Sequence, residues 1–353
     1  MKVLVAMSGG VDSSVAAGLV LEQGHEVVGA TLKLWGGVSD SGCCSVADVD
    51  DARRVAQTLG IDHHVFNYTD EFNRHVVEPF VRAHVEGTSP NPCIECNRHI
   101  KFDVLFDRAR RLGFDAVATG HHAQVLEHDG VHELARGADE KKDQSYVLGY
   151  LGEEQLASLL LPIGAMNKGE VRVHAERLGL RTWDKPDSQD VCFIEASKGR
   201  EAFLRQRVTL TPAKIVERAS GDVVGETDAA ELMTVGQRRG ILPGRDGEKR
   251  YVAHVDVARG LVEVGRLEDV VINHVKLVES SLSFTHDEPG NGDEVLIQCS
   301  AHGRVVRATV VRDPSWALRL HEPARPVAPG QTVVMYRIDE PSIVVGAAIV
   351  ASP

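Results

Sequence analysis

The stretch MKVLVAMSGGVDSSV, residues 1–15, joins an apolar run to a Ser/Gly-rich turn and then to apolar residues at helical spacing. This order predicts a strand, a loop and a helix. Gly9 and Gly10 carry no Cβ atom, so an oxyanion can approach the backbone there, and the serine hydroxyls and the N–H groups at the helix start supply donors. The stretch therefore predicts a phosphate-binding loop.

The type of loop narrows the chemistry. The Walker motif G-x-x-x-x-G-K-[ST] occurs nowhere in the chain, which argues against simple γ-phosphate hydrolysis. SGGVDSS at 8–14 instead resembles the pyrophosphate loop (PP-loop) of the ATP pyrophosphatases, which adenylate a carbonyl oxygen and release pyrophosphate. The resemblance implies that Asp12 lies where a magnesium-bound pyrophosphate is held. The alternative is a Ser/Gly-rich turn before an ordinary helix.

Length and composition set further limits. The chain has 353 residues, 43% hydrophobic and 25% charged, which is enough for two or three cores. Its apolar stretches fall short of the roughly 18 residues that a spanning helix needs, so we expect no membrane segment, no signal peptide and a cytoplasmic location. The net charge of −12 argues against indiscriminate nucleic-acid binding and leaves room for a local contact. Six cysteines without an export signal favour catalysis or metal binding.

The pattern of the chain changes near residue 200. Before that point, strand and helix patterns alternate, which predicts an α/β fold with a parallel sheet and ligands beyond the carboxyl ends of its strands. From residue 208 onward, short alternating runs predict a mostly β half. We expect a catalytic domain at 1–200, a small mostly-β middle domain at 201–270 and a C-terminal β-barrel at 271–353. The predicted strands are 3–6, 27–32, 65–68, 115–120, 213–217, 221–225, 251–264 folded at 258–260, 294–299, 305–311, 332–336 and 343–350.

Two cysteines lie in polar loops of the α/β half. Cys96 precedes a predicted helix at 102–112, near the positive end of its dipole, and Arg98, His99 and Lys101 are close in sequence. Both effects favour the thiolate, so Cys96 is a candidate nucleophile. Cys192 lies in the Asp-rich loop 187–194. For three other cysteines, Cys43, Cys44 and Cys299, we expect burial as small apolar residues.

Several motifs in one order point to a family. They are the PP-loop, NPCIECNRHIKFD at 91–103, TGHHA at 119–123, KDQSY at 142–146, KPDSQDVCFI at 185–194 and TVGQRRG at 234–240. Together they resemble the bacterial tRNA-specific 2-thiouridylases of the PP-loop superfamily over residues 1 to about 245. The cysteine pair separates the chain from argininosuccinate, asparagine and GMP synthetases, which share only the loop.

The resemblance implies an ATP-dependent tRNA-uridine 2-sulfurtransferase that thiolates the wobble uridine. ATP with Mg²⁺ adenylates the C2 oxygen, a persulfide on Cys192 delivers sulfur, and Cys96 attacks the persulfide and is left disulfide-bonded to Cys192. A sulfur donor protein, either a desulfurase or a relay protein, is implied as a partner beside tRNA. The implied ATP contacts are Ala6, Met7, Ser8, Gly9, Gly10, Val11, Asp12, Ser13, Leu32 and Gly120. The implied tRNA contacts are Asn91, Pro92, Cys93, His121, Lys142, Asp143, Gln144 and Gln331, with Asn91 to Cys93 beside the flipped base.

The chain departs from the family at Cys93, where many members have aspartate. Cys93, Cys96 and Cys192 together supply the ligand number of a [4Fe–4S] cluster with one open iron, so a cluster mechanism is an alternative to the persulfide. His122 also replaces a usual tyrosine. The tRNA-binding motif that the family has in the barrel is not found, and residues 304–307 are the stretch most similar to it. Two other functions stay open: an adenylating ligase acting on a small substrate, and a non-catalytic nucleotide-sensing or RNA-binding protein.

Overall fold

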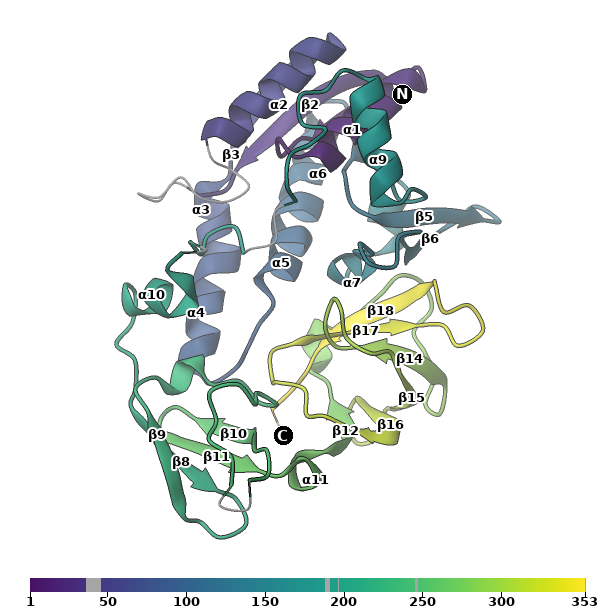
Figure 1. Cartoon of the computed structure of the whole chain (residues 1–353). Coiled ribbons are helices and arrows are strands. Elements are labelled where there is room, and N and C mark those ends of the chain that lie inside the picture. The colour runs from purple at the N-terminus through teal and green to yellow at the C-terminus, as the bar shows by residue number, and fades with distance from the viewer. Residues whose placement is uncertain (36–45, 188–190, 196, 245–246, 353) are drawn as a thin grey trace.

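The computed structural model describes residues 1–35, 46–187, 191–195, 197–244 and 247–352. These residues form a five-stranded parallel sheet, a two-stranded hairpin, a four-stranded sheet and a seven-stranded antiparallel sheet. Figure 1 shows them in chain order, from the helix-flanked sheet near the N-terminus to the strands at the C-terminus. The predicted α/β first half and mostly β second half are confirmed, while the domain boundaries near 200 and 270 stay predictions.

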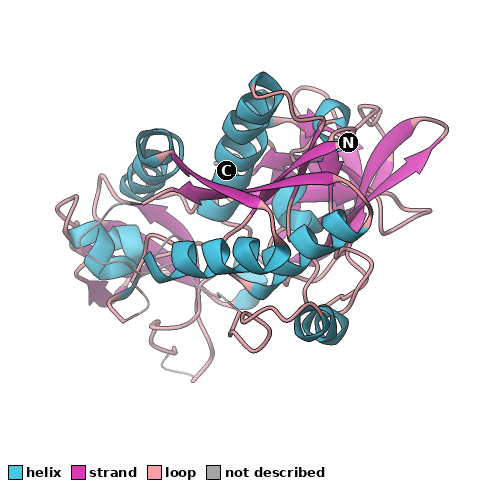
Figure 2. Cartoon of the chain, turned by 90° about the horizontal axis from the view of Figure 1, so that it is seen from above, coloured by secondary structure: helices cyan, strands magenta, loops and turns pink. Residues whose placement is uncertain are grey.

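The parallel sheet has the order β3-β2-β1-β4-β7. Its central strand β1 sends Val3 and Val5 to one face and Leu4 to the other, and each face is buried in its own hydrophobic cluster. In Figure 2 the strands lie between helices on either side. The strands are β1 (Lys2–Ala6), β2 (Glu26–Lys33), β3 (Asp62–Asn67), β4 (Ala116–Ala118) and β7 (Leu159–Leu160).

The face of Val3 and Val5 is covered by α1 (Val11–Glu22), α2 (Val46–Leu59) and α9 (Lys168–Arg177). Strand β2 lies on one side of β1 and β4 lies on the other, so the strand order reverses between β1 and β4. The loops after these two strands lie at that point. Ligands of open α/β sheets bind at such a point. The phosphate loop lies directly there, after β1.

Two longer helical runs cover the opposite face and contain π-helical segments. The first consists of α3 (Thr69–Phe72), η1 (Asn73–Val77) and α4 (Glu78–Val85), and the second of α5 (Pro92–Glu95), η2 (Cys96–Val104) and α6 (Leu105–Arg111). Phe72, Phe80, Ile100 and Phe102 from these runs are buried in the same cluster as Leu4. The second run positions Cys96 at the start of η2.

The remaining elements of the first half are short. A hairpin of β5 (Ala123–His128) and β6 (Val131–Arg136) turns at Asp129 and Gly130, both with positive φ. Ala135 makes a bridge to Ile343 of the C-terminal sheet. The short helices are α7 (Ser145–Leu148), α8 (Glu153–Leu156) and α10 (Gly199–Arg205).

The second half contains the two antiparallel-rich sheets. The four-stranded sheet has the order β10-β11-β8-β9 and the seven-stranded sheet the order β12-β16-β15-β14-β17-β18-β13. Their elements are β8 (Ala213–Glu217), β9 (Val223–Thr227), η3 (Ala230–Leu232), β10 (Tyr251–Asp256), β11 (Leu261–Gly265), α11 (Leu267–Val270), β12 (Ile272–Lys276), η4 (Glu279–Ser281), β13 (Ser283–Phe284), β14 (Glu294–Gln298), β15 (Val306–Val311), β16 (Ala317–Ala324), β17 (Thr332–Tyr336) and β18 (Val344–Ile349). Among the described residues, no helix combines the length and apolar character needed to cross a bilayer.

Candidate active site

The loop after β1 has the geometry of an anion site. Gly9 has φ +75°, and a Cβ atom there would come within 2.2 Å of the Asp48 carbonyl oxygen, so only glycine fits. Gly10 is the N-cap of α1, has extended backbone and adds no capping side chain. The Ser13 hydroxyl accepts a hydrogen bond from the Ser8 N–H at 3.1 Å and thereby closes the loop. The first turn of α1 thus keeps backbone N–H donors for an anion.

Gly120 brings the loop after β4 against this turn. A Cβ atom at position 120 would lie 2.5 Å from the Ser13 nitrogen, so the two backbones are in direct contact. The two residues predicted as ATP contacts from distant motifs therefore meet at the carboxyl edge of neighbouring strands. The other predicted ATP contacts lie in or beside β1, α1 and β2: Ala6, Met7, Val11 and Leu32.

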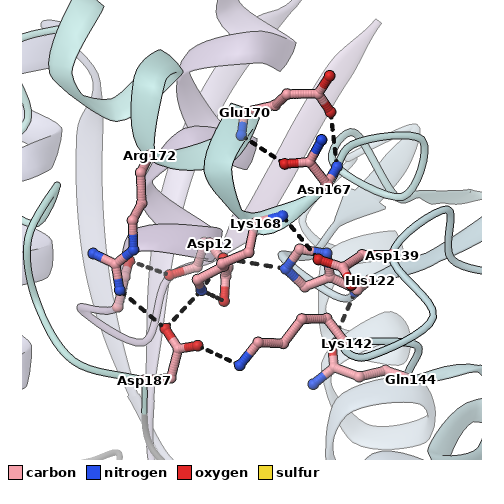
Figure 3. A network of polar contacts seen from close by, with 12 residues as sticks. Asp12, His122, Asp139, Lys142, Gln144, Asn167, Lys168, Glu170, Arg172 and Asp187 are labelled. Carbon is pink, nitrogen blue, oxygen red and sulfur yellow. Dashed lines mark hydrogen bonds and ion pairs between the residues drawn. The ribbon is translucent and has the colours of Figure 1, made fainter.

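Asp12 in the first turn of α1 is held by a lysine and a histidine (Figure 3). Lys168 Nζ donates to both carboxylate oxygens of Asp12 at 2.7 and 2.8 Å, and His122 Nε2 lies 3.3 Å from Oδ1. Burial alone would raise the pKa of Asp12, but the hydrogen bonds to His122 and Lys168 keep that pKa below its ordinary value. Asp12 is therefore ionised at neutral pH, which suits the predicted role beside Mg²⁺.

Asp187 continues the same set of contacts toward the Cys192 loop. Its carboxylate contacts Lys168 and Lys142, each at 2.7 Å, and Arg172 at 3.5 Å. Burial acts to raise the pKa of Asp187, yet the hydrogen bonds from Lys142 and Lys168 lower it below the ordinary value. Lys142, predicted to contact tRNA, thus pairs with the segment that leads to Cys192.

Lys185 bonds the same segment directly to the phosphate loop. Its Nζ donates to the Gly9 carbonyl at 2.9 Å and to Asp48 and Asp51 of α2 at 2.7 and 2.8 Å. Arg172 of α9 donates to the backbone carbonyls of Trp183 and Lys185. Residues 183–187, called the Asp187 segment below, are therefore hydrogen-bonded to α2, to α9 and to the phosphate loop.

The other residues predicted for tRNA in this region make contacts within the protein. Gln144 accepts a hydrogen bond from the His122 N–H at 2.9 Å. Asp143 is mostly buried and pairs with Arg136 at 2.8 Å. His121 is 8% exposed and lies 2.7 Å from the Thr119 hydroxyl, and burial lowers its pKa well below the ordinary value. Their contacts with tRNA stay predictions.

The two predicted catalytic cysteines share one hydrophobic cluster. Cys96 is buried at the start of η2, whereas Cys93, one turn earlier, is exposed. Cys192 is half-buried and packs against the cluster that contains Cys96. The neighbouring ring of Phe193 packs on Phe72 with a centroid distance of 5.7 Å. Cys192, Phe193 and the helix of Cys96 therefore contribute to one core, while Cys43 and Cys44 lie outside the described residues.

The charge around Cys96 differs from the expectation. His99 was expected to favour the thiolate as a nearby cation, but its ring lies 3.3 Å from Glu95 and 3.4 Å from Asp103. Hydrogen bonds to Asp103 and Glu95 raise the pKa of His99 to about 9. His99 is therefore cationic at neutral pH as expected, but its charge is paired with two carboxylates on its own helix, and its effect on the Cys96 thiolate stays a prediction. The predicted position before a helix at 102–112 is wrong, because Cys96 lies one turn inside the helical run that begins at Pro92.

The predicted base-binding loop follows a segment that is bonded to the C-terminal half of the chain. Asn91 caps α5 by accepting a hydrogen bond from the Cys93 N–H at 3.1 Å, and Pro92 is the first residue of that helix. Just before them, the Ser89 N–H donates to the Pro329 carbonyl at 2.8 Å, and Gln331 Nε2 donates to the Ser89 carbonyl. Gln331, predicted for tRNA, therefore contacts this loop from the C-terminal sheet.

Lys168, Asp187, Lys185 and Arg172 are site residues that the sequence analysis did not assign. Asn167 and Glu170 form a capping box at the start of α9, with each side chain bonded to the other's backbone N–H. The spacing N-x-x-E in the sequence signals that helix start. This spacing predicts that Lys168 lies at a helix N-terminus. It does not predict the partners of Lys168, because they lie far away in the sequence.

The comparisons with known proteins cover nearly the whole chain. Residues 1–196 match the model described as tRNA methyl transferase HUP domain, 201–266 the tRNA methyl transferase PRC-barrel domain, and 275–350 the Aminomethyltransferase beta-barrel domain. A relative from Chloroflexus aurantiacus, the tRNA-specific 2-thiouridylase MnmA, is 45% identical over 95% of this chain and 95% of its own length. The chain belongs to the tRNA-specific 2-thiouridylase family. The enzyme of the same name from Mycolicibacterium smegmatis is 45% identical over 96% of both chains.

Family membership confirms the predicted activity at the level of the family. This member of the tRNA-specific 2-thiouridylases is an ATP-dependent tRNA-uridine 2-sulfurtransferase, and tRNA is its substrate. A solved structure, the U34-tRNA thiolase NcsA from Methanococcus maripaludis with its [4Fe-4S] cluster, is similar over 54% of this chain and 61% of that chain, at 21% identity and a TM-score of 0.35. That likeness carries no argument about the cysteines.

Proposed function

We propose that this 2-thiouridylase acts on the wobble uridine of tRNA and transfers sulfur from a persulfide on Cys192, with Cys96 as the attacking thiolate. The observation that carries the proposal is the packing of Cys96 and Cys192 in one hydrophobic cluster, with the segment before Cys192 bonded to Gly9 of the phosphate loop and to Lys168. Two thiols from remote parts of the sequence are what a persulfide carrier and its partner require.

The ATP step is assigned to the phosphate loop. The first turn of α1 and Gly9 fit a pyrophosphate, and the ionised carboxylate of Asp12 fits an oxygen ligand of Mg²⁺. The uridine O2 attacks the α-phosphorus, pyrophosphate leaves, and the adenylated oxygen becomes a good leaving group. Asn91, Pro92 and Cys93 border the flipped base, since their helix start adjoins Cys96.

The sulfur step balances with the two thiols. The terminal sulfur of the Cys192 persulfide bonds to C2 while the Cys96 thiolate attacks the Cys192 sulfur, so the S–S bond of the persulfide breaks. AMP leaves with the former O2, and a Cys96–Cys192 disulfide remains. A dithiol reductant restores both thiols, and a donor protein, a desulfurase or a relay, reloads Cys192 with sulfane sulfur.

The cluster alternative fits the residues less well. A [4Fe–4S] cluster on Cys93, Cys96 and Cys192 needs three thiolates that point at one centre. Among the described residues, no three His, Cys, Asp or Glu side chains are grouped closely enough to hold a metal ion. Cys93 is also exposed while Cys96 is buried. No step is therefore assigned to a cluster.

Cysteine replacement tests the proposal with the purified enzyme, tRNA, Mg·ATP and a cysteine desulfurase as donor. We expect C96S and C192S to form no 2-thiouridine by nucleoside mass spectrometry, while tRNA-dependent pyrophosphate release persists. C299S is the matched control and should thiolate normally, because Cys299 directly follows β14 in the C-terminal half of the chain. Undiminished 2-thiouridine from C96S would instead favour a ligase that needs no cysteine.

A further inference from the structure

The carboxylate of Asp187 contacts three cationic side chains. Its Oδ1 lies 2.7 Å from Lys168 and 3.5 Å from Arg172, and its Oδ2 accepts from Lys142 at 2.7 Å. All four side chains are at most about a third exposed, with exposed fractions from 14% for Lys168 to 35% for Lys142. The contacts are therefore less screened than those of surface ion pairs.

Lys168 has no N–H group left for a phosphate in this arrangement. A lysine ammonium has three donors, and those of Lys168 face the two oxygens of Asp12 and one oxygen of Asp187. The phosphates of ATP arrive at the first turn of α1, where Asp12 lies. Lys168 can contact them only if one carboxylate moves away. Asp12 is the proposed ligand of Mg²⁺ and stays in place, so the carboxylate that moves is that of Asp187.

The triphosphate of ATP binds the lysines more strongly than the carboxylate of Asp187 does. It carries more negative charge than one carboxylate and offers more acceptor oxygens to Lys168 and Lys142. Resting on the ATP site proposed above, we propose that Asp187 is a positioning residue that competes with the phosphates of ATP for Lys168 and Lys142, so that nucleotide binding detaches Asp187 and changes the reactivity of Cys192.

The connection to Cys192 follows from how the Asp187 segment is fastened. Arg172 holds the backbone carbonyls of Trp183 and Lys185, and Lys185 Nζ holds the carbonyl of Gly9 in the phosphate loop itself. The segment therefore contacts the phosphate loop directly at Lys185 and, through Lys168 and Asp12, indirectly at Asp187, two residues further on. Cys192 lies five residues beyond Asp187.

The variant D187N tests the competition, because the amide keeps the shape and removes the charge. Affinity is measured with α,β-methylene-ATP and Mg²⁺ by calorimetry on the full chain. We expect D187N to bind the analogue roughly 3–10-fold more tightly than the wild type, since the phosphates no longer displace an ion pair. D187E keeps the charge and should bind like the wild type, which a purely structural role would not predict. The matched control is D184N, which makes the same change from carboxylate to amide at an exposed residue of the same segment.

The second readout is alkylation of Cys192 by iodoacetamide, followed by mass spectrometry of its peptide. We expect the analogue to raise the wild-type rate several-fold, and nucleotide-free D187N to show the raised rate already. A D187N affinity equal to or weaker than that of the wild type overturns the inference, as does a wild-type rate that the analogue leaves unchanged. If the wild type binds the analogue and thiolates tRNA, and D187N has the same affinity and the same alkylation rate as the wild type, only this inference is overturned. A wild type without affinity for the analogue removes the ATP site as well.

Discussion

Gly120 lies so close to Ser13 that a Cβ atom at position 120 would be 2.5 Å from the Ser13 nitrogen. The end of β4 and the first turn of α1 are thus in backbone contact. The nearest atoms are backbone atoms, which cannot swing aside as a flexible side chain can. The position of the anion-binding turn therefore depends on the absence of a side chain at residue 120.

Replacing this glycine tests that contact. G120A should shift the first turn of α1, weaken binding of α,β-methylene-ATP roughly tenfold or more and lower the free energy of unfolding by about 1–3 kcal/mol. Calorimetry and urea unfolding measure the two effects. G225A is the control, because a Cβ atom there meets Ile215 at an ordinary 3.7 Å. Wild-type ATP affinity in G120A would show that the turn tolerates the shift.

His99 makes stability depend on pH in a stated direction. Its folded pKa of about 9 lies above the unfolded value of 6.5, because Asp103 and Glu95 bond to the charged ring. The stabilisation is complete below pH 6.5 and is lost as pH rises through about 9. For this ring, whose side chain is 30% exposed, we expect a loss of about 1 kcal/mol across that range after solvent screening.

Urea unfolding at pH 6.5 and pH 9 checks this expectation. The variant H99Q should lose about 1 kcal/mol less than the wild type between the two pH values, because it has no proton to release. Equal losses in the two proteins would mean that another group causes the pH dependence.

Arg136 connects the first half of the chain to the C-terminal sheet. It pairs with the mostly buried Asp143, donates to Gln298 at 2.9 Å and stacks 3.7 Å from the ring centroid of Tyr336. R136M leaves Asp143 buried without this cation and should reduce the free energy of unfolding by about 3 kcal/mol. Denaturant unfolding provides the measurement.

Two further variants separate this pair from general surface effects. R304Q removes an ion pair with Glu322 whose partners are 84% and 75% exposed, and should cost less than about 0.5 kcal/mol. The double variant of R136M with D143N should lose clearly less than the sum of the single changes, because each single change leaves the other partner unpaired. Strict additivity would contradict the coupling.

Cys93 distinguishes the persulfide from the cluster. C93S should retain 2-thiouridine formation within about twofold of the wild type, because the sulfur step uses only Cys96 and Cys192. The enzyme is purified without oxygen, and iron is determined alongside the thiolated nucleoside. Loss of activity in C93S together with bound iron in the wild type would establish the cluster instead.

Local signals were sufficient for much of the fold. The strands at 213–217 and 332–336 were predicted with the bounds of β8 and β17, because alternation and flanking turns mark both ends. The strand predicted at 65–68 instead lies at Asp62–Asn67, where pairing with β2 extends it through two histidines. The β5–β6 hairpin was missed although Asp129-Gly130 is a strong two-residue turn signal.

The site was predictable only where one motif carries it. The turn around Gly9 follows from residues adjacent in sequence, and the cysteines follow from a family resemblance. The contacts of Lys168 do not, because Asp12 lies 156 residues away and no local period links the two. The carboxylates beside His99 could have been read from their i, i+4 spacing on one helix.

The loop at Ser89 has a practical consequence for dissecting the protein. Its backbone N–H and carbonyl are both satisfied by Pro329 and Gln331, and its hydroxyl lies 3.4 Å from that of Thr234. A fragment comprising the first 200 residues would strip the segment in front of Asn91 of all three contacts at once. Excised pieces are thus poor substitutes for the intact molecule in any study of base recognition, even though the nucleotide-binding strands belong to the excised piece.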